Sequence, residues 1–293
     1  MTAIGNPPPP PTNGNDVVEG AAEEILVLYG SQTGNSEAAA HEICSLLPAK
    51  LSSSSSTATT SRTSRRVITS RVMHLDDFLE VEKARWTRLV IIVTSSYGVG
   101  QAPIGARKFR DVCDEILNRY DDDGASSDGN GRANGGDCMD KKKNNDPRFL
   151  EGVQFALLGL GDSHYTTFFK NPTTIHKAMT LAGATLVGDI GKADASGTGN
   201  MEQSKVIDRW IENIWGDLAK AVTCTATSDN TVITKSDQLE KARIETWEIC
   251  LELFPEWRQK SGMTNYASMM VALYIPLIGI VVALLAHHFF LKV

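Results

Sequence analysis

Short apolar runs that alternate with helical patterns constrain the fold of this chain more than any other feature. Five runs rich in Val, Ile and Leu occupy residues 24–29, 66–73, 89–94, 153–159 and 184–188. Helical patterns follow them at 37–47, 78–85, 106–118, 173–181 and 201–221. Short continuous apolar runs are typical of buried parallel strands, which need crossover helices to connect them. The alternation therefore predicts an α/β fold with a doubly wound parallel sheet.

Two stretches within this alternation lack the apolar residues that a packed core requires. In residues 52–65, 11 of the 14 residues are Ser or Thr, and in residues 121–147, 16 of 27 are Asp, Asn or Gly. Neither stretch can bury enough apolar surface to offset the entropy lost on ordering. We predict that both are disordered insertions within one domain at 23–222. Without them about 160 residues remain, a normal size for a single domain.

The segments that flank the predicted domain have their own signatures. Residues 1–22 contain five consecutive prolines and no signal-peptide pattern, which predicts a disordered polyproline arm, with an SH3-type ligand as the alternative. A polar linker at 223–238 precedes an amphipathic helix at 239–260, in which Trp247 and Phe254 share one face. This helix either lies on a membrane surface as an aromatic anchor or packs on the domain.

The most apolar part of the chain lies close to its C-terminal end. Residues 267–286 form 20 nearly continuous apolar positions without a charge, and a helix of that length, about 30 Å, matches a bilayer core. We predict a transmembrane tail anchor at 266–290. Because Arg258 and Lys260 precede it and only Lys292 follows, the positive-inside rule places the domain in the cytosol. The length and low C-terminal charge favour the endoplasmic reticulum membrane.

Charge and cysteine content exclude several classes of protein. The formal net charge of −6 argues against nucleic acid as a partner, because phosphate neutralisation needs a basic face. The five cysteines are widely spaced and contain no C-x-x-C pair, which excludes a disulfide scaffold and a four-cysteine zinc site. Since no His or Cys spacing is typical of zinc ligands, we predict no metal site.

Glycine-rich loops follow the first, third and fourth apolar runs. The first loop, Tyr29-Gly-Ser-Gln-Thr-Gly-Asn-Ser36, leads into a helix and offers backbone N–H groups and hydroxyls to a phosphate, although the lysine of a P-loop is missing. The second loop presents Tyr97 and the third presents Tyr165. Because the carboxyl ends of parallel strands meet at one edge, the two tyrosines can sandwich a flat aromatic ring. Ordinary rim packing is the alternative.

The three loops, in this order, resemble the FMN-binding, flavodoxin-like module of the diflavin reductases over about residues 24–222, apart from the insertions. The resemblance implies a five-stranded parallel sheet in the order 2-1-3-4-5 and FMN as cofactor. It implies that Tyr97 and Tyr165 stack on opposite faces of the isoalloxazine and that Gly98 lies near flavin N5. The implied cofactor-binding residues are Ser31, Gln32, Thr33, Gly34, Asn35, Ser36, Ser95, Ser96, Tyr97, Gly98, Leu160, Gly161, Asp162, Ser163, His164, Tyr165, Phe168 and Phe169.

The chain also departs from this family's pattern. Val99 and Gln101 stand where the second loop of the family continues with acidic residues, and Asp194 is the only carboxylate in residues 192–197. Fewer negative charges should oppose the anionic reduced flavin less. The 71 residues after Val222 leave no room for the FAD- and NADPH-binding half of the family. We therefore expect electrons to come from a separate NAD(P)H-dependent reductase.

Together these features favour a membrane-tethered FMN electron carrier between that reductase and an unknown membrane or cytosolic acceptor. The flavin would supply the chemistry, so that no side chain is expected to act as a catalytic acid, base or nucleophile. Two alternatives stay open. One is a self-contained flavin oxidoreductase, for example one that acts on quinones, and the other is a tail-anchored adaptor that no longer binds flavin.

Overall fold

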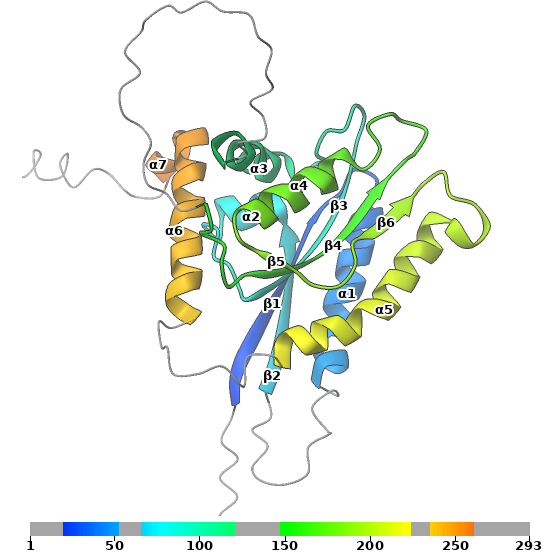
Figure 1. Cartoon of the computed structure of the whole chain (residues 1–293), viewed down its shortest axis with the longest axis horizontal. Helices are drawn as coiled ribbons and strands as arrows, with labels where there is room; N and C mark the ends of the chain where they lie inside the picture. Colours follow the sequence, from blue (N-terminus) through cyan, green and yellow to red (C-terminus); the bar gives the residue numbers. More distant parts are fainter. Residues whose placement is uncertain (1–19, 53–65, 121–146, 224–234, 261–293) are drawn as a thin grey trace, which may run out of the picture.

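The computed structural model describes residues 20–52, 66–120, 147–223 and 235–260 (Figure 1). The predicted proline-rich arm, most of the two predicted insertions, most of the linker and the predicted tail anchor lie outside these residues. None of the helices in the described ranges combines the length and hydropathy that a bilayer crossing requires.

One parallel sheet forms the centre of the molecule. Its strand order is β2-β1-β3-β4-β5, and β6 also pairs with β4, so the predicted order is confirmed. The strands are β1 (Gly20–Gly30), β2 (Arg66–His74), β3 (Leu89–Ser95), β4 (Gln154–Gly161), β5 (Thr185–Leu186) and β6 (Gly191–Asp194).

The last predicted strand is divided into two pieces. β5 has only two residues, which pair with the start of β4, and β6 pairs with the end of β4 at Leu158–Gly161. Gly188 lies between the two pieces with a φ of +66°. A residue in this left-handed conformation turns the chain away from the extended direction of a strand. The prediction of one strand at 184–188 is therefore corrected to a short strand, a turn and a second strand.

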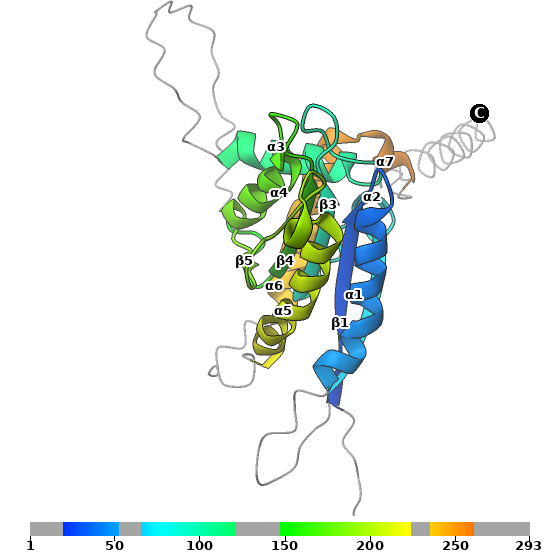
Figure 2. The same cartoon turned by 90° about the vertical axis from the view of Figure 1, so that its right-hand side faces the viewer.

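Helices cover both faces of the sheet, as the doubly wound prediction requires (Figure 2). In β1, Leu26 and Leu28 belong to one apolar core and Ile25 and Val27 to the other, because successive strand residues point to opposite faces. Helices α1 (Asn35–Ser52) and α5 (Gln203–Thr223) cover one face, and α2 (Leu75–Glu80), α3 (Arg107–Tyr120) and α4 (Lys170–Leu181) cover the other.

The helix predicted at 239–260 is two helices, α6 (Lys235–Leu253) and α7 (Glu256–Lys260), because Pro255 cannot donate the backbone hydrogen bond that would continue α6. Of its two predicted arrangements, the structure shows packing on the domain. Cys250 is fully buried against the core shared with α3, and Trp86 Nε1 donates a hydrogen bond to Thr246 Oγ1 at 3.0 Å. Arg119 adds an ion pair to Glu252 at 2.5 Å.

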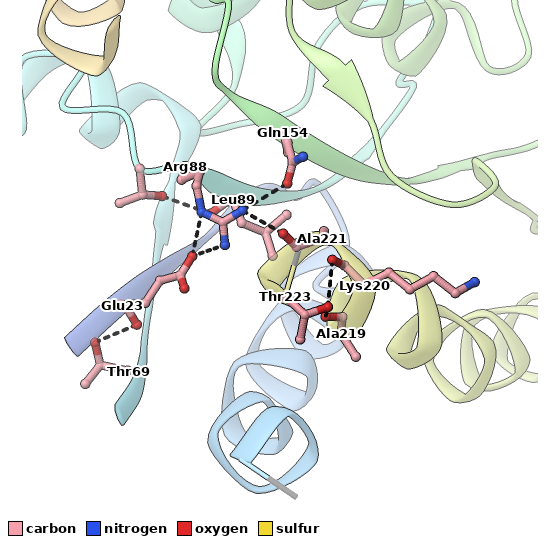
Figure 3. Close-up of polar contacts among 10 residues, drawn as sticks. Glu23, Thr69, Arg88, Leu89, Gln154, Ala219, Lys220, Ala221 and Thr223 are labelled. Carbon is pink, nitrogen blue, oxygen red and sulfur yellow. Dashed lines mark hydrogen bonds and ion pairs between the residues drawn. The ribbon is translucent and has the colours of Figure 1, made fainter. Parts of the chain in front are cut away.

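Polar contacts around Arg88 join the amino-terminal ends of the strands (Figure 3). The guanidinium of Arg88 forms an ion pair with Glu23 and donates to Gln154 Oε1 at 3.3 Å and to the carbonyl of Ala221 at 2.7 Å. These contacts tie the starts of β1, β3 and β4 to the end of α5. They lie at the edge of the sheet opposite the glycine-rich loops, so that edge has a structural role.

Candidate functional site

The glycine-rich loops meet at the carboxyl edge of the sheet and surround a cavity of about 500 Å³. This edge includes the point between β1 and β3 where the strand order reverses, which is where doubly wound sheets bind ligands. The volume lies within the roughly 300–1,000 Å³ of small-molecule sites. The cavity is lined by Gln32, Thr33, Asn35, Ser95, Ser96, Tyr97, Gly98, Leu160, Gly161, Asp162, Tyr165, Thr167, Phe168, Ala195 and Gln203.

The first loop has the local geometry of an anion site. Gly34 has a φ of +93°, which glycine adopts without strain, and its N–H donates to Ser31 Oγ at 3.0 Å. The N–H of Ser31 donates to the carbonyl of Ile104 at 3.1 Å, which ties this loop to the segment after the second loop. Helix α1 begins at Asn35, and the first N–H groups of a helix have no partner within it. The N-terminus of α1 therefore offers donors to a phosphate.

One atom of the cavity wall lacks a partner. The side-chain oxygen Gln32 Oε1 is buried, and within the described part of the chain it accepts no hydrogen bond. Leaving a buried acceptor unsatisfied is unfavourable by about 1–3 kcal/mol. A ligand that brings a hydroxyl or N–H donor to this position would remove that penalty.

The buried side-chain amide of Asn171 holds the second loop in place. Asn171, at the start of α4, is fully buried and donates through Nδ2 to Thr94 Oγ1 at 3.2 Å and to the carbonyl of Ser95 at 3.0 Å. Its backbone N–H donates to Ser96 Oγ at 3.0 Å. Tyr97, which directly follows Ser96, keeps 47% of its surface exposed although it lines the cavity. The loop is therefore fixed while its aromatic ring remains available to a ligand.

The third loop is joined to the second and carries the other tyrosine. Thr167 Oγ1 donates to the carbonyl of Gly98 at 3.2 Å, so the two loops form one wall. Tyr165 is 57% exposed and lines the same cavity as Tyr97. Two rings that share one cavity and are poorly covered by protein favour a flat ligand between them over ordinary rim packing.

Two carboxylates organise the third loop and β6. Asp162 accepts hydrogen bonds from Ser196 Oγ and from the N–H of His164 at 3.0 Å, which lower its pKa to about 2. Burial tends to raise the pKa of Asp194, but hydrogen bonds from the N–H groups of Ser163 and Ser196 outweigh it and leave the pKa below its usual value. Both groups are therefore ionised at neutral pH.

Gln203, the first residue of α5, connects three parts of the site. Its Oε1 accepts a hydrogen bond from Asn35 Nδ2 at 2.9 Å, and its Nε2 donates to the carbonyls of Gly161 and Ala193 at 3.3 Å each. One amide thus links the start of α1 with the ends of β4 and β6. The sequence contains no local signal for this role, because the residues that it joins are far apart in the chain.

Most of the residues predicted to bind the cofactor line the cavity. Thr167, Ala195 and Gln203 line it as well and were not predicted. Thr167 lies inside the third loop between two predicted residues, so the motif could have indicated it. Ser36 and Phe169 are buried beneath the loops. The predicted residues outside the cavity lining are Ser31, Gly34, Ser36, Ser163, His164 and Phe169, and a direct contact from them to a ligand stays a prediction.

A doubly wound parallel sheet in the order 2-1-3-4-5, with a cavity at its carboxyl edge, has the flavodoxin-like arrangement. The sequence model of the family described as Flavodoxin matches residues 27–210, which are more than half of the chain. The chain therefore belongs to the flavodoxin family. It is a flavodoxin-like electron-transfer protein, and FMN is the cofactor that this family binds.

Curated relatives are much longer than this chain. It is 29% identical over 198 residues to the bifunctional cytochrome P450/NADPH–P450 reductase of Bacillus cereus, covering 67% of this chain and 14% of that protein. It is 25% identical over 225 residues to the methionine synthase reductase of Caenorhabditis elegans, covering 77% of this chain and 26% of that protein. A mutant flavodoxin from Pseudomonas aeruginosa is 19% identical, with a TM-score of 0.41 over 68% of this chain and 97% of that one.

The residues of the site fit FMN on three counts. The α1 N-terminus and the hydroxyl of Thr33 suit a phosphate, and the two tyrosines suit a flat ring system. The unsatisfied acceptor Gln32 Oε1 suits a cofactor that carries several hydroxyl and N–H donors. The cavity therefore has a matching group for each chemical part of FMN.

Proposed function

We propose that the protein is a membrane-tethered FMN carrier that passes electrons from a separate NAD(P)H-dependent reductase to a membrane or cytosolic acceptor. The observation that carries this proposal is the cavity in which a helix N-terminus and two exposed tyrosines come together. When bound, FMN would supply reversible electron transfer, so the protein itself needs no catalytic acid, base or nucleophile.

The side chains of the cavity would bind and orient the cofactor. Thr33 and the N–H groups at the start of α1 would hold the phosphate, and Gln32 Oε1 would accept a hydrogen bond from the cofactor. Tyr97 and Tyr165 would cover the two faces of the ring and exclude water from it. Offset stacking contributes about 0.5–1.5 kcal/mol for each ring beyond the burial of apolar area.

The relatives support an electron donor of the reductase kind. The chain is related to FMN modules that receive electrons from FAD- and NADPH-binding reductase domains. It aligns with 14% and 26% of the two relatives described above, so most of each relative has no counterpart in the matched region.

The uncharged apolar run at 267–286 supports a membrane tether, and the place where the described chain ends bears on where the tether would hold the site. In α7, the ring of Trp257 lies 4.8 Å below the ammonium of Lys108, at the start of α3. Because α3 follows the second loop, the chain leaves the domain near the edge that carries the site. An anchor at 266–290 would then hold the FMN site close to the membrane, and the endoplasmic reticulum is the membrane that we propose.

Anaerobic mixing experiments test the direction of electron flow. The purified, FMN-loaded protein should not be reduced by NADPH or NADH alone, and it should be reduced when a catalytic amount of an FAD-containing NADPH reductase is added. Reduction by NAD(P)H alone at a rate independent of added reductase would favour the self-contained oxidoreductase. Replacing Thr33 with Trp should abolish FMN uptake, and unchanged biological activity of this variant would favour the flavin-free adaptor.

Fluorescence imaging in cells tests the tether. A fluorescent protein fused to the N-terminus should appear at the endoplasmic reticulum and should be released to the cytosol when residues 261–293 are deleted. A fusion that stays in the cytosol with the tail present would contradict the proposed anchor.

A further inference from the structure

A lysine lies beside the cavity on β6, the strand that runs along the end of β4 (Figure 1). The ammonium of Lys192 lies 5.0 Å from the ring centroid of Phe168 and 5.2 Å from that of Phe169. Both distances are within the roughly 6 Å of a cation–π contact, which holds the charge over the rings. Since Phe168 lines the cavity and Lys192 does not, the ammonium lies next to the cavity wall.

The two carboxylates near this wall are already engaged by hydrogen bonds. Among the described residues that line the cavity, Asp162 is the one with a carboxylate. It accepts hydrogen bonds from Ser196 and His164. Asp194 accepts from the N–H groups of Ser163 and Ser196. The described lining includes neither Lys nor Arg, and the ammonium of Lys192 lies in the adjoining layer, over the ring of Phe168.

We propose that Lys192 tunes the redox preference of the site by stabilising the reduced, anionic flavin ring relative to the neutral oxidised ring. This inference rests on the proposed binding of FMN. Two electrons from the reductase and one proton from solvent convert the neutral oxidised ring into a reduced ring that carries one negative charge. Only the reduced form attracts the ammonium of Lys192 as a net charge, so the attraction shifts the equilibrium toward reduction.

The position of Lys192 sets the size of the effect. Its ammonium lies 5.0 Å from the centroid of the Phe168 ring that lines the cavity, so it would attract a bound ring through space and not by direct contact. Lys192 is solvent-exposed and the Debye length is about 8–10 Å, so salt screens part of the attraction. We expect removal of the charge to weaken binding of the reduced cofactor relative to the oxidised one about fivefold. At 29.6 mV for each factor of ten in this two-electron couple, the change corresponds to about 20 mV.

The test uses the full-length protein and compares three variants. Lys192→Gln removes the charge, and Lys192→Arg keeps it. Lys205→Gln removes an equivalent charge in α5. Lys205 forms an ion pair with Glu202 at 3.1 Å, and it is not part of the cavity lining. Fluorescence titration gives the Kd for oxidised FMN, and anaerobic dye equilibration gives the midpoint potential. Lys192→Gln should bind oxidised FMN within twofold of the wild type and have a two-electron midpoint potential about 20 mV lower, whereas the other two variants should match the wild type.

The possible outcomes separate this inference from the proposed function. A wild-type protein that takes up no FMN overturns the proposed function, and the inference falls with it. FMN uptake with equal potentials in the wild type and Lys192→Gln overturns the inference alone. An equal shift in Lys205→Gln would assign the effect to the general surface charge and would also overturn it. A shift in Lys192→Gln that disappears at 1 M salt, with Lys192→Arg unchanged, supports it.

Discussion

Gln203 offers the sharpest test of how the fold assembles the site. Replacing Gln203 with Leu keeps the approximate volume and removes the amide that joins Asn35 to the carbonyls of Gly161 and Ala193. The change leaves the three loops themselves untouched. It therefore asks whether the start of α1 must be held by α5 to bind the phosphate of FMN.

The magnitude follows from the three hydrogen bonds. Each contributes about 0.5–1.5 kcal/mol, and the two at 3.3 Å are the longer ones. We expect the folded state to lose about 1–3 kcal/mol in total. The bond to Asn35, at 2.9 Å, is the one that orients the phosphate site. Its loss of about 1 kcal/mol should weaken FMN binding about fivefold, since 1.4 kcal/mol is a factor of ten.

Parallel titrations with FMN and riboflavin separate positioning from general damage. Riboflavin lacks the phosphate, so Gln203→Leu should weaken FMN binding about fivefold and riboflavin binding by less than twofold. Gln154→Leu is the matched control, because Gln154 bonds to Arg88 at the opposite edge of the sheet. It should lower the free energy of unfolding without changing either Kd. Equal losses for FMN and riboflavin in Gln203→Leu would refute the positioning role.

Three further predictions concern the walls of the site. Tyr97→Ala and Tyr165→Ala should each weaken FMN binding by about threefold to tenfold through lost stacking, and each should shift the visible flavin bands. Unchanged spectra in both variants would argue against ring stacking. The Asp162 carboxyl should titrate near pH 2 by NMR, because its pKa is about 2 in the folded state. Its stabilising contribution should be present above the ordinary pKa of 3.8 and lost as the pH falls toward 2, and Ser196→Ala should move the titration back toward 3.8. In Gly159→Ala the new Cβ would lie 2.4 Å from the ring of Phe169, so the free energy of unfolding, measured by thermal unfolding, should fall by about 1–3 kcal/mol. Gly216→Ala, with nothing within 4 Å of its new Cβ, should instead raise the free energy of unfolding by about 0.5–1 kcal/mol. Equal effects of both changes would contradict the packing described at Gly159.

The parts of the fold that depend on local pattern were predictable from the sequence. The first four apolar runs became β1 to β4 within a few residues of their predicted bounds, because such runs can be buried on both faces only inside a parallel sheet. The loops that carry Tyr97 and Tyr165 were predictable for the same reason, since each directly follows a buried strand. The tail at 266–290 lies outside the described residues and stays a prediction.

Features that depend on distant contacts were not predictable. The hydrogen bond between Asn35 and Gln203 joins residues that are 168 positions apart, and neither residue belongs to a local pattern that links them. The docking of α6 depends on the pairing of Trp86 with Thr246, which are 160 positions apart. The division of the fifth strand depends on the backbone conformation of Gly188, which the residue permits but does not require.

Flavin binding itself is the central claim, and one titration tests it most directly. The full-length protein, purified and then mixed with FMN, should quench flavin fluorescence to an end point of one FMN per chain. Its visible bands should shift on binding, and Thr33→Trp should abolish both changes. A protein that is colourless when purified and leaves the fluorescence of added FMN unchanged would contradict the account.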